Sequence, residues 1–128
     1  MIKKENKFAT CLNCMDGRVQ LPVIHWIQKQ YGFDYIDMIT EAGMDGLLAK
    51  DDVDIKNVIE KITISLERHN SEMIFIVGHF DCAGNPVDND IHKEHVHAAV
   101  NKIKSLFTRC EIVGLWISDK WEVERIYD

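Results

Sequence analysis

Five residues in two short stretches carry side chains that could do chemistry together. Cys14, Asp16 and Arg18 form a Cys-x-Asp-x-Arg pattern, and a His-x-x-Cys pattern, His79 and Cys82, follows more than sixty residues later. Two thiolates and one imidazole suit zinc better than magnesium or calcium, which prefer oxygen ligands. A zinc ion with three protein ligands keeps a fourth position for water. The two stretches therefore predict one zinc site, provided that they meet in the fold.

Asp16 and Arg18 predict a second part of this site. Zinc lowers the pKa of its bound water to about 7, so hydroxide becomes available at neutral pH. Asp16 lies two residues beyond Cys14, so its carboxylate can reach that water or the metal itself. Arg18 can form a bidentate pair with Asp16, which would orient the carboxylate and keep it from filling the open position. The pattern as a whole predicts a hydrating enzyme.

The elements that must position these residues alternate between strands and helices. Apolar segments predict strands at 8–12, 34–40, 73–77 and 111–117, and the alternation over 121–127 predicts a closing antiparallel edge strand. Helices are expected from Pro22 to Tyr31, from Ile55 to Leu66 and around Val96 to Leu106, while 41–46 and 85–90 are expected to be loops. This order predicts an α/β fold with a mostly parallel central sheet of about four strands plus the edge strand, and helices on both faces.

Such a fold has a preferred place for a site. Ligands bind beyond the carboxyl ends of parallel strands, near the point where the strand order reverses. The stretches that begin with Cys14 and with His79 each come directly after a predicted strand. They would meet at this point if the first and third strands were neighbours and the second lay outside the first.

Length and composition limit the other possibilities. The 128 residues predict one domain, 1–128, and the formal net charge of −6 argues against nucleic-acid binding, which needs a basic surface. No apolar run is long enough to span a membrane, and the charged segment Met1–Lys7 is not followed by the apolar region of a signal peptide. The sequence therefore predicts a cytoplasmic protein with reduced cysteines.

The two motifs, Cys14-Met-Asp-Gly-Arg18 and Gly78-His-Phe-Asp-Cys82, resemble the paired signatures of the β-class carbonic anhydrases. The resemblance implies that Cys14, His79 and Cys82 bind zinc, and that Asp16 and Arg18 orient the zinc-bound hydroxide that converts carbon dioxide to bicarbonate. Glu41-Ala-Gly43 stands in the place of the family's Arg-Asn-Ala-Gly-Asn loop, which implies that the Gly43 backbone borders the substrate pocket.

The sequence also departs from the family. Position 17 is Gly where the family usually has Ser, and the Arg and both Asn of the other loop are absent. The family's long N-terminal helical arm, which usually wraps a partner subunit, has no counterpart, so a homodimer or higher homo-oligomer is implied by resemblance only. The chain is similar to a minimal, divergent relative. The resemblance implies that its substrate is carbon dioxide or a related small molecule such as carbonyl sulfide or carbon disulfide.

Alternatives from other classes remain open at this point. One is a zinc-binding or regulatory protein without activity. Another is a thiol oxidoreductase, because Cys11 forms a Cys-x-x-Cys pattern with Cys14, although strand alternation turns Cys11 away from the loop. His92, His95 and His97 form a cluster that is interpreted as a solvated helix surface, with an auxiliary metal or proton-shuttle role as a minor alternative.

Overall fold

The protein is described by a computed structural model, in which residues 6–127 form five strands and four helices. The strands are β1 Phe8–Cys14, β2 Tyr35–Glu41, β3 Met73–His79, β4 Glu111–Ile117 and β5 Val123–Tyr127. The helices are α1 Gln20–Tyr31, α2 Met44–Ala49, α3 Lys56–Arg68 and α4 Asn89–Leu106, with a short 3-10 turn, Gly17–Val19, before α1. Most of the charged segment Met1–Lys7 lies outside the described residues.

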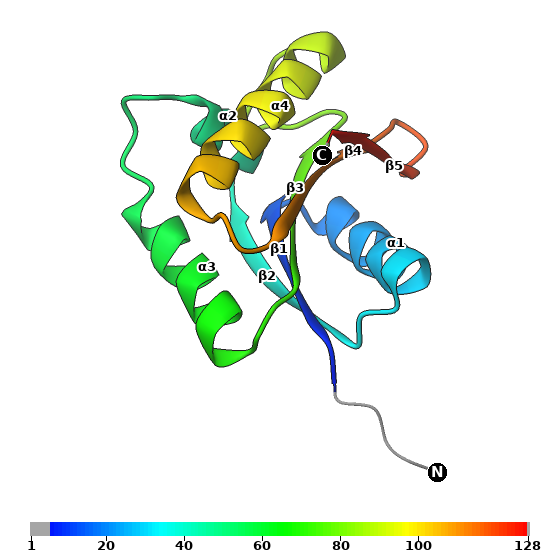
Figure 1. The fold of residues 1–128 in the computed structure, drawn as a ribbon. Coiled ribbons are helices and arrows are strands. Elements are labelled where there is room, and N and C mark those ends of the chain that lie inside the picture. Colours follow the sequence, from blue (N-terminus) through cyan, green and yellow to red (C-terminus); the bar gives the residue numbers. More distant parts are fainter. Residues whose placement is uncertain (1–5, 128) are drawn as a thin grey trace.

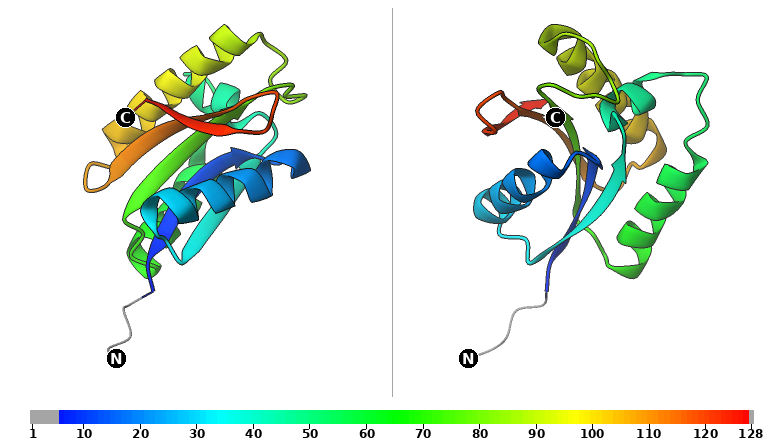
Figure 2. Two further views of the ribbon diagram at one scale, coloured as in Figure 1. Left: turned by 90° about the vertical axis from the view of Figure 1, so that its right-hand side faces the viewer. Right: turned by 180° about the vertical axis from the view of Figure 1, so that it is seen from behind.

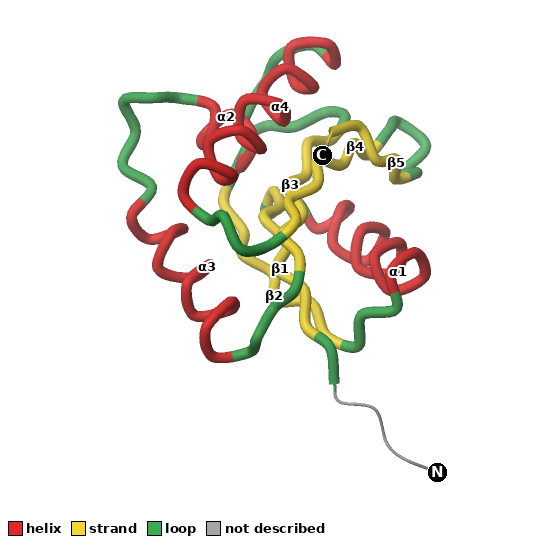
Figure 3. Tube along the Cα trace, in the orientation of Figure 1, coloured by secondary structure: helices red, strands yellow, loops and turns green. Residues whose placement is uncertain are grey.

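All five strands belong to one sheet in the order β2-β1-β3-β4-β5 (Figures 1 and 3). The first four strands run parallel, and β5 pairs antiparallel with β4 at the edge. The chain moves outward from β1 to β2 and then returns to place β3 on the other side of β1. The order therefore reverses between β1 and β3, which is the arrangement that the sequence required for the two motifs to meet.

Helices cover both faces of the sheet, as predicted (Figure 2). The core on one face includes Val23 and Ile27 of α1, and the core on the other includes residues of α2, α3 and α4. Strand β3 contributes side chains to both cores, because Phe75 packs toward α1 whereas Ile74 and Ile76 pack on the opposite face of the sheet. A strand buried on both faces reads as a continuous apolar run, which is what this segment shows.

Helix ends follow local chemistry. Gly32 ends α1 in the left-handed conformation, with φ of 73°, and its N–H donates to the Gln28 carbonyl at 2.9 Å. The Asp88 carboxylate caps α4 by accepting from the Ile91 N–H at 2.9 Å. The helix end predicted at Tyr31 is confirmed, since the glycine that follows adopts this conformation without a steric penalty.

The sequence-based prediction missed one helix and made two strands too short. Residues 41–46 were expected to form a loop, but α2 begins at Met44, and β1 and β3 continue to include Cys14 and His79. Asp45 and Gly46 are poor helix formers, so local propensity does not predict α2. The helix is stabilised instead by burial of Met44 and Leu48 against the sheet and α4.

None of the helices within residues 6–127 has both the length and the apolar character needed to cross a bilayer.

Candidate metal centre

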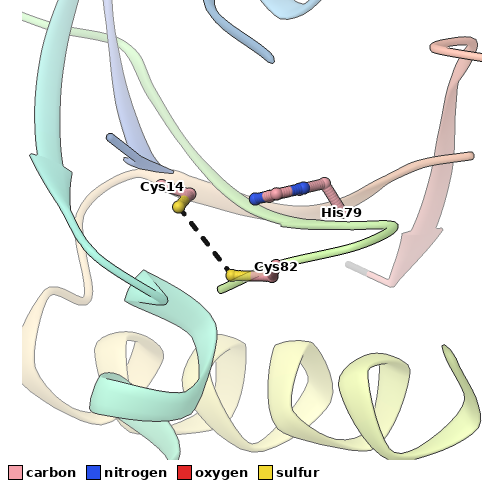
Figure 4. A group of neighbouring side chains, drawn as sticks. All are labelled: Cys14, His79 and Cys82. Atoms are coloured by element: carbon pink, nitrogen blue, oxygen red, sulfur yellow. Dashed lines mark hydrogen bonds between the residues drawn. The ribbon is translucent and has the colours of Figure 1, made fainter. Parts of the chain in front are cut away.

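The three predicted metal ligands lie together at the reversal point of the sheet. Cys14 is the last residue of β1, His79 is the last residue of β3, and Cys82 follows three residues later (Figure 4). Their ligand atoms all lie within 4.8 Å of one another, and the two sulfurs are 3.8 Å apart. All three side chains are buried. Two parallel strands thus deliver a compact sulfur-nitrogen-sulfur group.

His79 is oriented so that one ring nitrogen is free to bind a metal. Its Nδ1 lies 2.7 Å from the Phe80 carbonyl oxygen, and because a carbonyl only accepts, Nδ1 carries the proton and donates. Nε2 therefore has the lone pair. This atom is buried and has no hydrogen-bond partner in the described part of the chain. A buried nitrogen without a partner is costly, and a metal ion would satisfy it.

The thiols of Cys14 and Cys82 share one proton through a hydrogen bond. The hydrogen bond between Cys82 and Cys14 lowers the pKa of the Cys14 thiol to about 4, and the Gly43 N–H, which donates to Cys14 Sγ at 3.4 Å, acts in the same direction. The same hydrogen bond between the two sulfurs, together with burial, raises the pKa of Cys82. One thiolate is thus already favoured, and a cation placed between the sulfurs would replace the shared proton. The group fits a soft divalent metal.

Asp16 and Arg18 form the pair that the sequence predicted. Arg18 Nη2 donates to Asp16 Oδ2 at 2.7 Å, and Arg18 Nε lies 3.1 Å from Oδ1. These hydrogen bonds lower the pKa of Asp16 to about 2. Within residues 6–127 the group of candidate ligands does not include Asp16, whose two carboxylate oxygens both accept from Arg18.

Two further residues hold Arg18, and the sequence assigned neither of them to it. Asp81 lies inside the second motif, and Trp121 lies in the turn between β4 and β5. Arg18 Nη1 donates to Asp81 Oδ2 at 3.2 Å, and its guanidinium carbon lies 4.7 Å from the centre of the Trp121 ring. No spacing along the chain relates these positions to Arg18.

Close packing of two glycines joins the loops on either side of the ligands. A Cβ on Gly84 would lie 2.5 Å from both the Ala42 carbonyl carbon and the Gly43 nitrogen. Gly43 itself has φ of 63°, in the region that favours glycine. The loop that carries Cys82 therefore rests directly on the segment whose N–H contacts Cys14. Gly17, where the family usually has Ser, has nothing within 4 Å of such a Cβ, so a side chain is tolerated there.

We expect Gly84→Ala to separate these loops. The added methyl meets backbone atoms that cannot rotate away, so the free energy of unfolding should fall by about 1–3 kcal/mol, and metal affinity should fall with it because Cys82 moves relative to Cys14. Denaturant unfolding and metal titration measure the two effects. Gly17→Ala is the matched control and should change neither, and equal behaviour of the two variants would contradict the packing argument.

The structure corrects the interpretation of the histidine cluster as a solvated surface. His92 is 1% exposed, and its Nδ1 donates to the buried Asp45 carboxylate at 2.7 Å. Asn85 also donates to Asp45, at 3.2 Å, and lies 2.9 Å from His95 Nδ1. Only His97 is exposed, and it stacks on Tyr127. The error follows from the missed helix, because α2 brings Asp45 onto α4 and buries the face that carries His92.

We expect Asp45→Ala to be strongly destabilising. It leaves the His92 Nδ1–H and the Asn85 amide without their buried acceptor, and breaking such a buried pair costs about 3 kcal/mol or more in free energy of unfolding. Chemical denaturation measures this. Asp51→Ala, at an exposed aspartate, is the control. A double-mutant cycle tests the coupling, with the single variants Asp45→Leu and His92→Leu and the variant that carries both. If the loss of stability in the double variant equalled the sum of the two single losses, the two side chains would not be coupled.

The Cys11-Cys14 redox alternative finds no support in the geometry. Cys11 is completely buried, and burial raises the pKa of its thiol, which disfavours the reactive thiolate. The sulfur that contacts Cys14 belongs to Cys82.

A groove of about 690 Å³ lies at the opposite end of the sheet. It is lined by residues that precede β3 and β4, including Ser71, Arg109 and Cys110. Among the described residues, the one candidate group of metal ligands lies at the other end of the sheet, where β1 and β3 end. The groove and the candidate metal-binding group therefore lie at opposite ends of the sheet.

The fold and the site together define a class of protein: an α/β sheet with a buried metal-binding group of two cysteines and one histidine at its reversal point. The chain belongs to the family described as putative carbonic anhydrase, whose model matches residues 4–127. A search of curated proteins found no match. The predicted resemblance to the carbonic anhydrases is confirmed.

Solved structures agree on the fold. Tetrameric β-carbonic anhydrases from the filamentous ascomycete Sordaria macrospora have a TM-score of 0.69 at 12% identity, covering 96% of this chain and 82% of theirs. A carbonic anhydrase from Glaciozyma antarctica gives 0.61 at 13% identity, with coverage of 91% and 80%. The β-carbonic anhydrase CcaA gives 0.59 at 11% identity, with coverage of 97% and 85%. At these identities the likeness concerns the fold alone.

Proposed function

We propose that this protein catalyses the reversible hydration of carbon dioxide to bicarbonate with zinc as its cofactor. The observation that carries the proposal is the compact Cys14-His79-Cys82 group, with its free imidazole nitrogen, next to an ionised Asp16. Family membership supports the same reaction class.

In this proposal Cys14, His79 and Cys82 would hold the zinc ion. Two sulfurs and one nitrogen suit zinc. Bound there, zinc would supply Lewis acidity that lowers the pKa of water to about 7. The Phe80 carbonyl fixes the His79 tautomer, and the Gly43 N–H stabilises negative charge on Cys14. Gly43 is also proposed to border the substrate pocket, since it lies against this ligand.

Asp16 is proposed to act as an oriented hydrogen-bond acceptor for the attacking water. With a pKa of about 2 it is a poor store for a proton at neutral pH, so the proton released in CO2 + H2O → HCO3⁻ + H⁺ must pass to solvent or buffer. What a permanently ionised carboxylate can do is accept a hydrogen bond and fix where the oxygen lone pair points. Arg18 is proposed to fix the carboxylate in turn.

Stopped-flow hydration on zinc-loaded protein tests the proposal. One zinc per chain with rapid acidification of a CO2 solution, abolished by chelation and restored by zinc, is the expected result. A protein that binds one zinc per chain and leaves the hydration rate at the buffer value would be the zinc-binding protein without activity, and the proposed reaction would be wrong.

We also propose that the protein forms a homo-oligomer in the cytosol. Its fold neighbours from Sordaria macrospora are tetrameric, and exposed apolar residues lie within and just after the first motif: Met15 is 64% exposed and Leu21 is 63% exposed. The four cysteines are free, as the reducing cytosol favours. Sedimentation velocity tests the assembly, and a single species at the chain mass of 14.8 kDa would contradict it.

A further inference from the structure

Arg18 is held from three sides, although its side chain is 46% exposed. Its Nε and Nη2 groups donate to the Asp16 carboxylate. On the other edge, Nη1 donates to the Asp81 carboxylate at 3.2 Å and Nη2 donates to the Asp81 carbonyl oxygen at 3.0 Å. The guanidinium carbon also lies over the aromatic ring of Trp121, 4.7 Å from the ring centre. An exposed arginine normally samples many rotamers, so an isolated Asp16-Arg18 pair would be poorly fixed.

The backbone is strained at both of these partners. Three non-glycine residues of the described chain have positive φ, and two of them are Asp81, at 57°, and Trp121, at 59°. Tryptophan rarely adopts this conformation, because its side chain crowds the backbone. Strain of this kind persists only where surrounding contacts impose it, and it concentrates at functional sites. The two strained residues come from different loops, one after β3 and one between β4 and β5, and both contact the same guanidinium.

We propose that Asp81 and Trp121 are positioning residues that clamp Arg18 and thereby hold the Asp16 carboxylate in the orientation that hydration requires; this inference rests on the proposed function. Asp81 accepts hydrogen bonds from Nη1 and Nη2, the Trp121 ring lies against the guanidinium, and Nε and Nη2 donate to Asp16. The clamp joins the loop of the second motif to the first motif independently of any metal.

A simpler account is that Asp81 has a positive φ only because the His-x-x-Cys turn needs it. Asp81→Gly separates the two accounts, since glycine adopts that φ freely but lacks the carboxylate. Trp121→Leu keeps an apolar side chain but removes the aromatic face, and Trp121→Phe keeps the face. Asp52→Gly, at an exposed aspartate, is the control.

Two measurements are needed on the zinc-loaded full chain. The first is the Arg18 Nε–H signal in a ¹H–¹⁵N spectrum, assigned by its loss in Arg18→Lys. We expect a sharp, ordered signal in the original protein, broadening in Asp81→Gly and Trp121→Leu, and recovery in Trp121→Phe. The second is steady-state hydration, for which we expect kcat to fall about tenfold in the two broadened variants, with KM and zinc content unchanged and no further fall in an Arg18→Ala background.

The outcomes are distinct. An unchanged Arg18 signal in both variants overturns the clamp, whatever the activity. A broadened signal with unchanged kcat overturns the positioning role. If the original protein shows no hydration, the proposed function fails by itself, and the positioning role fails with it even where the Arg18 signal reports a clamp. Broadening and a lower kcat in both Asp81→Gly and Trp121→Leu, with neither change in Trp121→Phe, support the inference.

Discussion

Replacement of Cys82 by serine is expected to release the metal and with it all catalysis. A four-ligand zinc site contributes about 10–16 kcal/mol of binding free energy, so one thiolate accounts for roughly 3 kcal/mol, or a hundredfold or more in affinity. Serine is nearly isosteric, but its hydroxyl stays protonated and is a poor ligand for a soft site. Metal analysis after dialysis should fall from about one zinc per chain to near zero, and the hydration rate should fall to that of the buffer.

The same result is expected for His79→Ala, because His79 supplies the only nitrogen ligand of the candidate group through its unpartnered Nε2. Cys110→Ser is the matched control. Cys110 is partly exposed and lies at the far end of the sheet, so its replacement should leave zinc content unchanged. Full zinc retention by the Cys82→Ser protein would remove Cys82 from the ligand set and would require a different metal site.

Asp16→Asn is expected to leave zinc in place but lower kcat by about a hundredfold. Asparagine has the same shape, yet its amide presents a donor at one of the two positions where the carboxylate accepts, and it no longer attracts Arg18 through charge. The water would therefore lose its oriented acceptor while the three metal ligands stay unchanged. Stopped-flow hydration with parallel metal analysis separates the two effects.

Arg18→Ala should behave in a similar way, since it frees Asp16 to turn toward the metal. Asp52→Asn, at an exposed position outside the site, is the control for loss of one negative charge. An Arg18→Ala protein that hydrates carbon dioxide at the original rate would show that the pair has no part in the reaction.

Two errors in the sequence-based interpretation, the missed helix α2 and the exposed placement of His92, share one physical origin. The residues 44–49 have weak helical propensity, yet they form α2 because tertiary burial outweighs propensity. Because the prediction lacked α2, it left the α4 face that carries His92 uncovered, and His92 was therefore expected to be exposed to solvent. The structure places it 1% exposed against Asp45. A short helix of six residues thus changed the environment of a residue almost fifty positions away.

The sequence by itself determined the strand-helix alternation, the two motifs and the ligand types. It could do so because apolar periodicity and the metal preference of thiols and imidazoles are local properties. Only the tertiary structure decided that β1 and β3 are neighbours, that the Phe80 carbonyl selects the His79 tautomer, and that Asp81 and Trp121 converge on Arg18. These features depend on packing between segments far apart in the chain, and no pattern of spacing along the chain encodes which segments pack together.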